Sequence, residues 1–134
     1  MGRLTDLERS VLDKILHGDA PILRALQQQA ASAVVSEREL TGTGFMTRLT
    51  LPRAVPRAPV KPGMIRFGDV EAQIEGLQYG AGFLVYVRDG FLAAVEGYSY
   101  EEPWPTSIGT FSVKYMSDGR DFGELQPSLS TSVR

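Results

Sequence analysis

The sequence predicts an α+β fold in which an N-terminal helical hairpin packs on a mostly antiparallel sheet of about 4–6 strands. Apolar residues recur at helical spacing through residues 4–33 and change to a period of two after Val34. Two apolar runs flank Asp89-Gly90, a dipeptide typical of β-hairpin turns. The length of 134 residues suits one domain, which we expect to span residues 1–127 and to be followed by a disordered tail at residues 128–134.

The two helices are indicated by the residues at their ends. Thr5 and Glu8 have the spacing of a capping box at the start of the first helix, and Gly18 suits the left-handed position after its last turn. Asp19 is expected to cap the second helix, with Pro21 in its first turn. The connection is short, so we expect an αα-hairpin.

Each helix has an apolar face. The apolar positions of the first helix are Leu4, Leu7, Val11, Leu12, Ile15 and Leu16. Those of the second helix are Ile22, Leu23, Leu26, Ala30 and Ala33. Gln27, Gln28 and Gln29 are expected to lie towards its other side.

Strands are predicted at residues 34–40 and 45–51, with a turn at Thr-Gly-Thr-Gly between them. In the second strand Phe45, Thr47, Leu49 and Leu51 face one way. Residues 52–63 contain four prolines and are expected to form a loop or arm. Residues 64–76 predict one strand, although a short helix that begins at Asp69 fits part of the pattern equally well.

The runs on either side of Asp89-Gly90 predict a central hairpin. Both runs are apolar on both faces near the turn, as expected of strands in the middle of a sheet that helices cover on one side. A further strand is expected within residues 108–116, with Phe111, Val113 and Tyr115 on one face.

Composition narrows the classes of function. The chain has no cysteine and one histidine, so neither a thiol nucleophile nor a zinc site is expected, and no cofactor is predicted. The net charge of −2 is not that of a typical nucleic-acid-binding protein. Charges scattered through the first 19 residues exclude a signal peptide or a membrane span there, so we expect a cytoplasmic protein that binds neither nucleic acid nor membrane.

Six residues are candidates for a ligand site or an interface: Arg38, Glu96, Tyr98, Tyr100, Glu101 and Trp104. Glu96 follows an apolar run and could act as an acid or base beside an arginine, or could pair with an arginine structurally. The aromatic and acidic residues of "YSYEEPWP" fit an interface, since tyrosine and tryptophan are enriched in binding hot spots. The same stretch also fits a connection that folds back over a sheet edge.

Residues 23–28, 38–45 and 95–105 resemble segments of a family of small uncharacterised bacterial proteins. Residues 38–45 read Arg-Glu-φ-Thr-Gly-x-Gly-Phe and residues 95–105 read φ-Glu-Gly-Tyr-x-Tyr-x-x-Pro-Trp-Pro, where φ is apolar. The resemblance covers most of residues 4–105 and implies no assigned chemistry. The hairpin around Asp89-Gly90 is also similar to those of small bacterial immunity-type proteins.

Three functions are consistent with these observations. The first is a non-catalytic protein-interaction module that binds another protein or a second copy of itself through Tyr100 and Trp104. The second is an immunity-like inhibitor that meets a basic toxin with Glu101 and Glu102. The third is a small ligand-binding domain or enzyme that uses Glu96 with Arg38 or Arg48.

Overall fold

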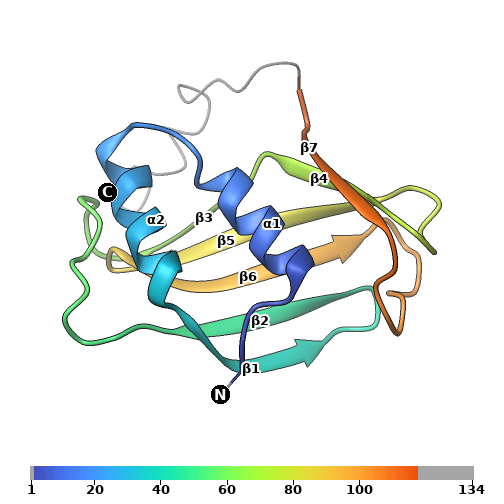
Figure 1. The fold of residues 1–134 in the computed structure, drawn as a ribbon, viewed down its shortest axis with the longest axis horizontal. Helices are drawn as coiled ribbons and strands as arrows, with labels where there is room; N and C mark the ends of the chain where they lie inside the picture. Colours follow the sequence, from blue (N-terminus) through green and yellow to red (C-terminus); the bar gives the residue numbers. More distant parts are fainter. Residues whose placement is uncertain (1, 118–134) are drawn as a thin grey trace.

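The computed structural model describes residues 2–117 as one sheet with two helices on one of its faces (Figure 1). The helices are α1 (Asp6–Ile15) and α2 (Pro21–Ser32). The strands are β1 (Val34–Leu40), β2 (Gly44–Thr50), β3 (Met64–Phe67), β4 (Val70–Ile74), β5 (Ala81–Arg88), β6 (Phe91–Ser99) and β7 (Phe111–Tyr115). Every strand pair is antiparallel, which confirms the α+β class with an antiparallel sheet. The expected tail at residues 128–134 lies outside the described residues.

Within residues 2–117 the sheet has seven strands in the order β1-β2-β6-β5-β4-β7, with β3 also beside β5. Residues 64–74 form β3 and β4 along the same edge of β5, so the strand prediction for this segment is confirmed and the helix alternative is wrong. The two strands are separated at Gly68, where an added Cβ would lie 2.2 Å from the carbonyl oxygen of Phe83. β3 and β4 stand where one strand was expected, which is why the count exceeds the predicted range.

The Asp89-Gly90 turn is confirmed. Asp89 has a φ of 52° and Gly90 a φ of 85°, as a type I′ turn requires. The turn joins β5 to β6, and these strands occupy the middle of the sheet. The central position explains why their inward residues are fully buried, including Phe83, Val85 and Val95.

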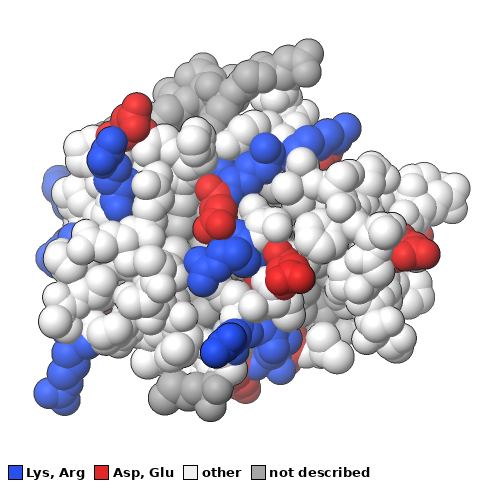
Figure 2. Space-filling model, in the orientation of Figure 1, with Lys and Arg blue, Asp and Glu red and all other residues white. Residues whose placement is uncertain are grey.

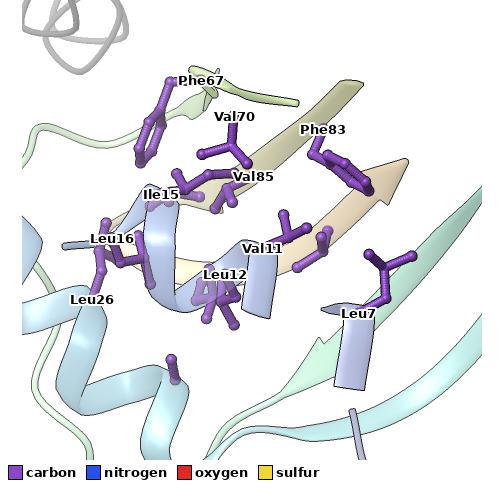
Figure 3. Packing of buried hydrophobic residues seen from close by; sticks show 14 of the residues in the cluster. Leu7, Val11, Leu12, Ile15, Leu16, Leu26, Phe67, Val70, Phe83 and Val85 are labelled. Atoms are coloured by element: carbon purple, nitrogen blue, oxygen red, sulfur yellow. The ribbon is translucent and has the colours of Figure 1, made fainter. Parts of the chain in front are cut away.

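Both helices cover the same face of the sheet. α1 lies over β4, β5 and β7, and α2 lies over β6 (Figure 1). Because the two helices cover different strands, the structure matches the expected helical hairpin only roughly. Figure 3 shows the apolar face of α1 directed at side chains from the strands. The residues at this contact include Leu7, Val11, Leu12, Ile15, Val70, Phe83 and Val85. A fully buried side chain of this size contributes about 1.5–3 kcal/mol, so this contact fixes α1 on the sheet.

The helix ends differ in part from the sequence prediction. The capping box of Thr5 and Glu8 is present, with a bond from each backbone N–H to the other side chain. Asp19 does not cap α2, because the N-cap is Ala20; the Asp19 carboxylate instead accepts a hydrogen bond of 3.3 Å from Arg24. Pro21 occupies the first turn, where its missing N–H costs no helical hydrogen bond.

Gln29 is the main correction to the predicted helix faces. Its side chain is fully buried and not turned away from the core. The amide nitrogen donates to the carbonyl oxygens of Gly90 and Pro56, both at 2.9 Å. The amide oxygen accepts from the backbone N–H of Leu92 at 2.7 Å. Gln29 therefore holds the tip of the central hairpin and the proline-rich loop against α2.

Replacement of Gln29 by alanine is expected to destabilise the fold by about 2–3 kcal/mol, because it leaves buried backbone groups at the hairpin tip without partners. The free energy of unfolding, measured in urea, checks this. Gln28→Ala is the matched control, since Gln28 is exposed on the same helix. Equal losses in the two variants would show that the amide of Gln29 makes no special contribution.

Candidate functional site

The candidate site is a pocket of about 470 Å³ at one end of the molecule. It lies between the start of α1, the end of β1, the start of β2 and the loop that leads to β7. Its lining residues are Thr5, Asp6, Leu7, Glu8, Arg38, Leu40, Phe45, Trp104, Pro105, Thr106, Ser107, Ile108, Gly109 and Phe111. The wall is thus part apolar and part charged, which is usual for a binding site.

Glu8 forms the polar part of the pocket wall. Its carboxylate accepts hydrogen bonds from Arg38 Nη2 at 2.7 Å, from Arg38 Nε at 2.9 Å and from the hydroxyl of Thr47. It also accepts from the backbone N–H of Thr5 at 2.8 Å. The Glu8 side chain is only 3% exposed. One carboxylate therefore joins α1 to β1 through a bidentate contact with Arg38 and to β2 through the hydroxyl of Thr47.

This pair is held in its charged form. Burial of Glu8 opposes ionisation, but hydrogen bonds from Arg38, Thr47 and Thr5 and the charge of Arg38 outweigh it, so the pKa of Glu8 is lowered. The hydrogen bond to Glu8 raises the pKa of Arg38. A general acid or base needs a pKa near the working pH, so Glu8 suits a structural role better than proton transfer.

Arg38 retains a donor for a ligand. Its Nε and Nη2 atoms are engaged by Glu8, and Nη2 also donates to the carbonyl oxygen of Arg3 at 3.3 Å. Within residues 2–117 no hydrogen bond engages Nη1. The side chain is 33% exposed, so a ligand acceptor can reach Nη1 without breaking the contact with Glu8.

The apolar wall is aromatic. Phe45 and Trp104 meet edge to face, with ring centroids 5.4 Å apart, and the backbone N–H of Trp104 donates to the carbonyl oxygen of Gly42 at 2.9 Å. Leu40 and Ile108 stand beside this wall with exposed fractions of 72% and 36%. Large apolar side chains at the mouth of a pocket are typical of a surface that another molecule covers.

The predicted site residues fall into separate places. Arg38 and Trp104 both line the pocket. Glu96, Tyr98 and Tyr100 do not line it: Glu96 and Tyr98 alternate along β6 with the buried Val95 and Gly97, so they occupy the opposite face of the sheet. The aromatic cluster expected from the sequence is therefore divided between two surfaces.

On that opposite face Glu96 accepts a hydrogen bond of 2.6 Å from the hydroxyl of Tyr86. Burial and this bond to Glu96 raise the pKa of Tyr86. Tyr98 and Tyr100 meet edge to face with centroids 5.8 Å apart. Glu96 is thus partnered by a tyrosine from the neighbouring strand.

Glu101 and Glu102 lie in the bend that follows β6. The carboxylate of Glu102 accepts hydrogen bonds from the backbone N–H groups of Gln78 and Tyr79 at 2.8 and 2.9 Å. Glu101 is exposed and has a φ of 69°, a left-handed conformation that is costly for a residue with a side chain. Of the two acids, Glu101 is therefore the one whose carboxylate is presented to solvent.

Two residues of the polar cluster around Arg38, Glu8 and Thr47, were not among the candidates predicted from the sequence. Glu8 was recognised only as a helix cap, because the capping-box spacing is local whereas Arg38 lies far along the chain. Thr47 was placed on the same face of its strand as Phe45 and Leu49, and the structure shows that this face is buried. A threonine on an otherwise apolar inward face signals a buried hydrogen-bond partner, although it does not reveal which.

Comparisons of the chain with known protein families, with curated proteins and with solved structures find no match. The resemblance carried by residues 38–45 and 95–105 stays a prediction. Among residues 2–117 no helix is both long and apolar enough to cross a lipid bilayer. The same residues contain no group of three or more His, Asp or Glu side chains arranged to hold a metal ion.

The Glu8→Gln variant is expected to lose about 3 kcal/mol of stability at neutral pH, because the amide cannot accept the hydrogen bonds of both Arg38 donors. Since folding lowers the pKa of Glu8, the stabilisation is present above the unfolded pKa of about 4.3 and is lost as the pH falls below it. Urea unfolding at a series of pH values checks this. The free energies of unfolding of wild type and variant should converge in acid. A difference that stays constant with pH would contradict the interpretation that Glu8 and Arg38 form an ionised pair.

The Glu101→Gly variant is expected to be more stable than wild type by about 0.5–1 kcal/mol, because glycine adopts positive φ without strain. Thermal unfolding measures the effect. Glu101→Ala is the control, since alanine removes the carboxylate but keeps the strained backbone. A gain of the same size with alanine would assign the effect to charge and not to conformation.

Proposed function

We propose that the protein is a non-catalytic interaction module whose pocket receives an apolar side chain of a partner protein. The observation that carries this proposal is the exposure of Leu40 and Ile108 beside an aromatic wall formed by Phe45 and Trp104. An apolar side chain that enters the pocket removes these surfaces from water, which is the main source of affinity at the centre of protein interfaces.

The polar part of the pocket suits a peptide. Arg38 lines the pocket together with the apolar wall, and its Nη1 can donate to a backbone carbonyl oxygen of the incoming segment. Its positive charge is already balanced by Glu8, so the site does not demand an anionic partner. Recognition through one apolar anchor and one backbone hydrogen bond matches this combination of groups.

The distribution of charge supports an apolar anchor over a charged one. Figure 2 shows basic and acidic side chains interspersed on the face seen there. The net charge of the chain is −2. A protein that captures its partner by long-range attraction usually presents a larger surface of one sign. An inhibitor of a basic toxin would use Glu101 and Glu102. The carboxylate of Glu102 already accepts hydrogen bonds from backbone groups of the fold, so of these two acids Glu101 is the one that such a toxin could meet.

A peptide selection tests the proposal. Random peptides displayed on phage are selected on the wild-type protein, and the selected sequences are synthesised and titrated while tryptophan emission is recorded. Trp104 is the one tryptophan of the sequence, so its fluorescence reports on the pocket wall. We expect selected peptides to share an apolar residue and to change the emission in a saturable way.

The discriminating variant is Leu40→Glu, which places a charge beside the pocket at a side chain that is 72% exposed and so leaves the fold intact. We expect it to weaken peptide binding at least about tenfold, or 1.4 kcal/mol. Met116→Glu, at an exposed methionine that does not line the pocket, is the control and should bind as wild type does. If no peptide is selected, or if Leu40→Glu binds as well as the control, the proposal is wrong.

A further inference from the structure

The outer edge of β1 carries backbone groups that no strand within residues 2–117 uses. β1 is the first strand in the sheet order, so among the described strands only β2 pairs with it along its length (Figure 1). Thr41 donates to the carbonyl oxygen of Gly44 across the turn, and bonded and non-bonded pairs alternate along an antiparallel ladder. The backbone N–H and C=O groups of Arg38 and Leu40 therefore point away from β2.

These four groups are accessible to another chain. Leu40 is 72% exposed, and Arg38 is exposed as well. Apart from the pairing of β1 with β2, no hydrogen bond within the described part of the chain engages the backbone of either residue. Two N–H and two C=O groups in a row at strand spacing are the pattern that an additional extended segment satisfies.

The same edge already accepts an extended segment next to these groups. The N–H of Gly2 donates to the carbonyl oxygen of Val35 at 2.9 Å, and the N–H of Val35 donates to that of Gly2 at 2.8 Å, which forms an antiparallel bridge. A β-bulge after Val35 adds one residue to β1, so the next outward groups belong to Arg38 and Leu40. The edge is thus paired at its start and open at its end.

The open edge is continuous with the pocket. The side chains of Arg38 and Leu40 both line the pocket. Side chains of an added strand alternate between the two faces of the sheet, so the one opposite Leu40 lies against the pocket wall. Backbone pairing and the apolar anchor of the proposed function, on which this inference rests, are therefore available to one segment at the same time.

The other face of β1 indicates which side chains the added strand carries. Glu37 and Glu39 lie on that face, and both contact Arg48, at 3.4 and 3.3 Å. Two carboxylates share one guanidinium, so one negative charge of this group is left unbalanced. Opposite charges at facing strand positions stabilise pairing, and like charges destabilise it. A basic residue opposite Glu39 is favoured, whereas a second copy, in the register that satisfies all four backbone groups, would set Glu39 against its own equivalent.

We propose that the partner of the pocket is an extended peptide segment that adds to the open edge of β1 in antiparallel orientation. An apolar side chain opposite Leu40 lies against the pocket wall, and a basic side chain lies opposite Glu39. Pairing with the backbone gives affinity, and the alternating side chains give specificity. The acids that protect this edge from indiscriminate pairing thereby select a basic strand.

N-methylated peptides test this inference. The probe is the capped peptide Thr-Leu-Lys-Thr-Lys, titrated into the full-length protein while the emission of Trp104 is recorded. Its leucine is placed opposite Leu40, so the backbone N–H groups of its second and fourth residues face β1 and that of its third faces away. Methylation of either facing nitrogen should weaken binding at least about tenfold, because a hydrogen bond is lost and the methyl group collides with the edge. Methylation of the third nitrogen is the matched control and should leave binding unchanged.

Two further measurements examine the protein side of the contact. In the complex, hydrogen exchange should slow at the amides of Arg38 and Leu40 and stay the same at Glu39, whose N–H faces β2. Glu39→Lys should weaken binding of the probe at least about tenfold. A probe with glutamate as its third residue should recover that loss with the Glu39→Lys variant. Circular dichroism shows whether the variant is folded.

Failure of this inference and failure of the proposed function give different results. If all the methylated peptides bind as the unmethylated probe does while Leu40→Glu weakens each of them, the pocket binds peptides without strand addition, and this inference alone is wrong. If Leu40→Glu binds every peptide as wild type does, the proposed function is wrong. A probe that does not bind at its solubility limit, a wild-type dimer that the probe dissociates, or tighter binding by a peptide of residues 118–134 would also overturn the inference.

Discussion

The carboxylate of Glu8 is the interaction on which the rest of the structure depends. It closes the capping box of α1 and binds Arg38 of β1 and Thr47 of β2, so it joins the first helix to the first hairpin. Such a charge is stable in the interior only because each oxygen has donors. Loss of any donor leaves a buried charge partly unpaired, so the cluster specifies one position of α1 on the sheet. The same cluster forms one wall of the pocket, which makes the candidate site a consequence of how the fold is held.

Gln29 has a comparable role at the other end of the sheet. Its amide satisfies backbone groups of the central hairpin and of the proline-rich loop, as the Glu8 carboxylate satisfies groups around the first hairpin. Across residues 2–117 every buried side-chain nitrogen and oxygen has a partner. The apolar core accounts for the strength of helix–sheet packing, whereas these two polar side chains fix its register, because hydrogen bonds are directional and hydrophobic burial is not.

The sequence predicted the features that depend on neighbours along the chain. The capping box, the Asp89-Gly90 turn and the alternation in β2 are local patterns with a direct physical cause, and each is confirmed. Gln29 was misplaced because a glutamine is usually solvated, although its spacing of three from the buried Leu26 could have indicated the inward face.

The site was predicted in part. Arg38 and Trp104 were named as candidates and line the same pocket, but Tyr98 lies on the opposite face of the sheet, and the ring of Tyr100 packs against it. Sequence proximity fails here because the turn after β6 carries the chain from one face of the sheet to the other. The pairing of Glu8 with Arg38 depends on strand order, which a single sequence does not disclose.

The most direct test of the role of Glu8 is a titration of its side-chain carboxyl carbon by nuclear magnetic resonance in the folded wild-type protein. We expect a pKa below the ordinary value of about 4.3, in spite of almost complete burial, because Arg38, Thr47 and Thr5 all donate to the ionised form. A pKa at or above that value would mean that burial outweighs these donors, and would contradict an ionised Glu8 as the centre that holds α1 to the sheet.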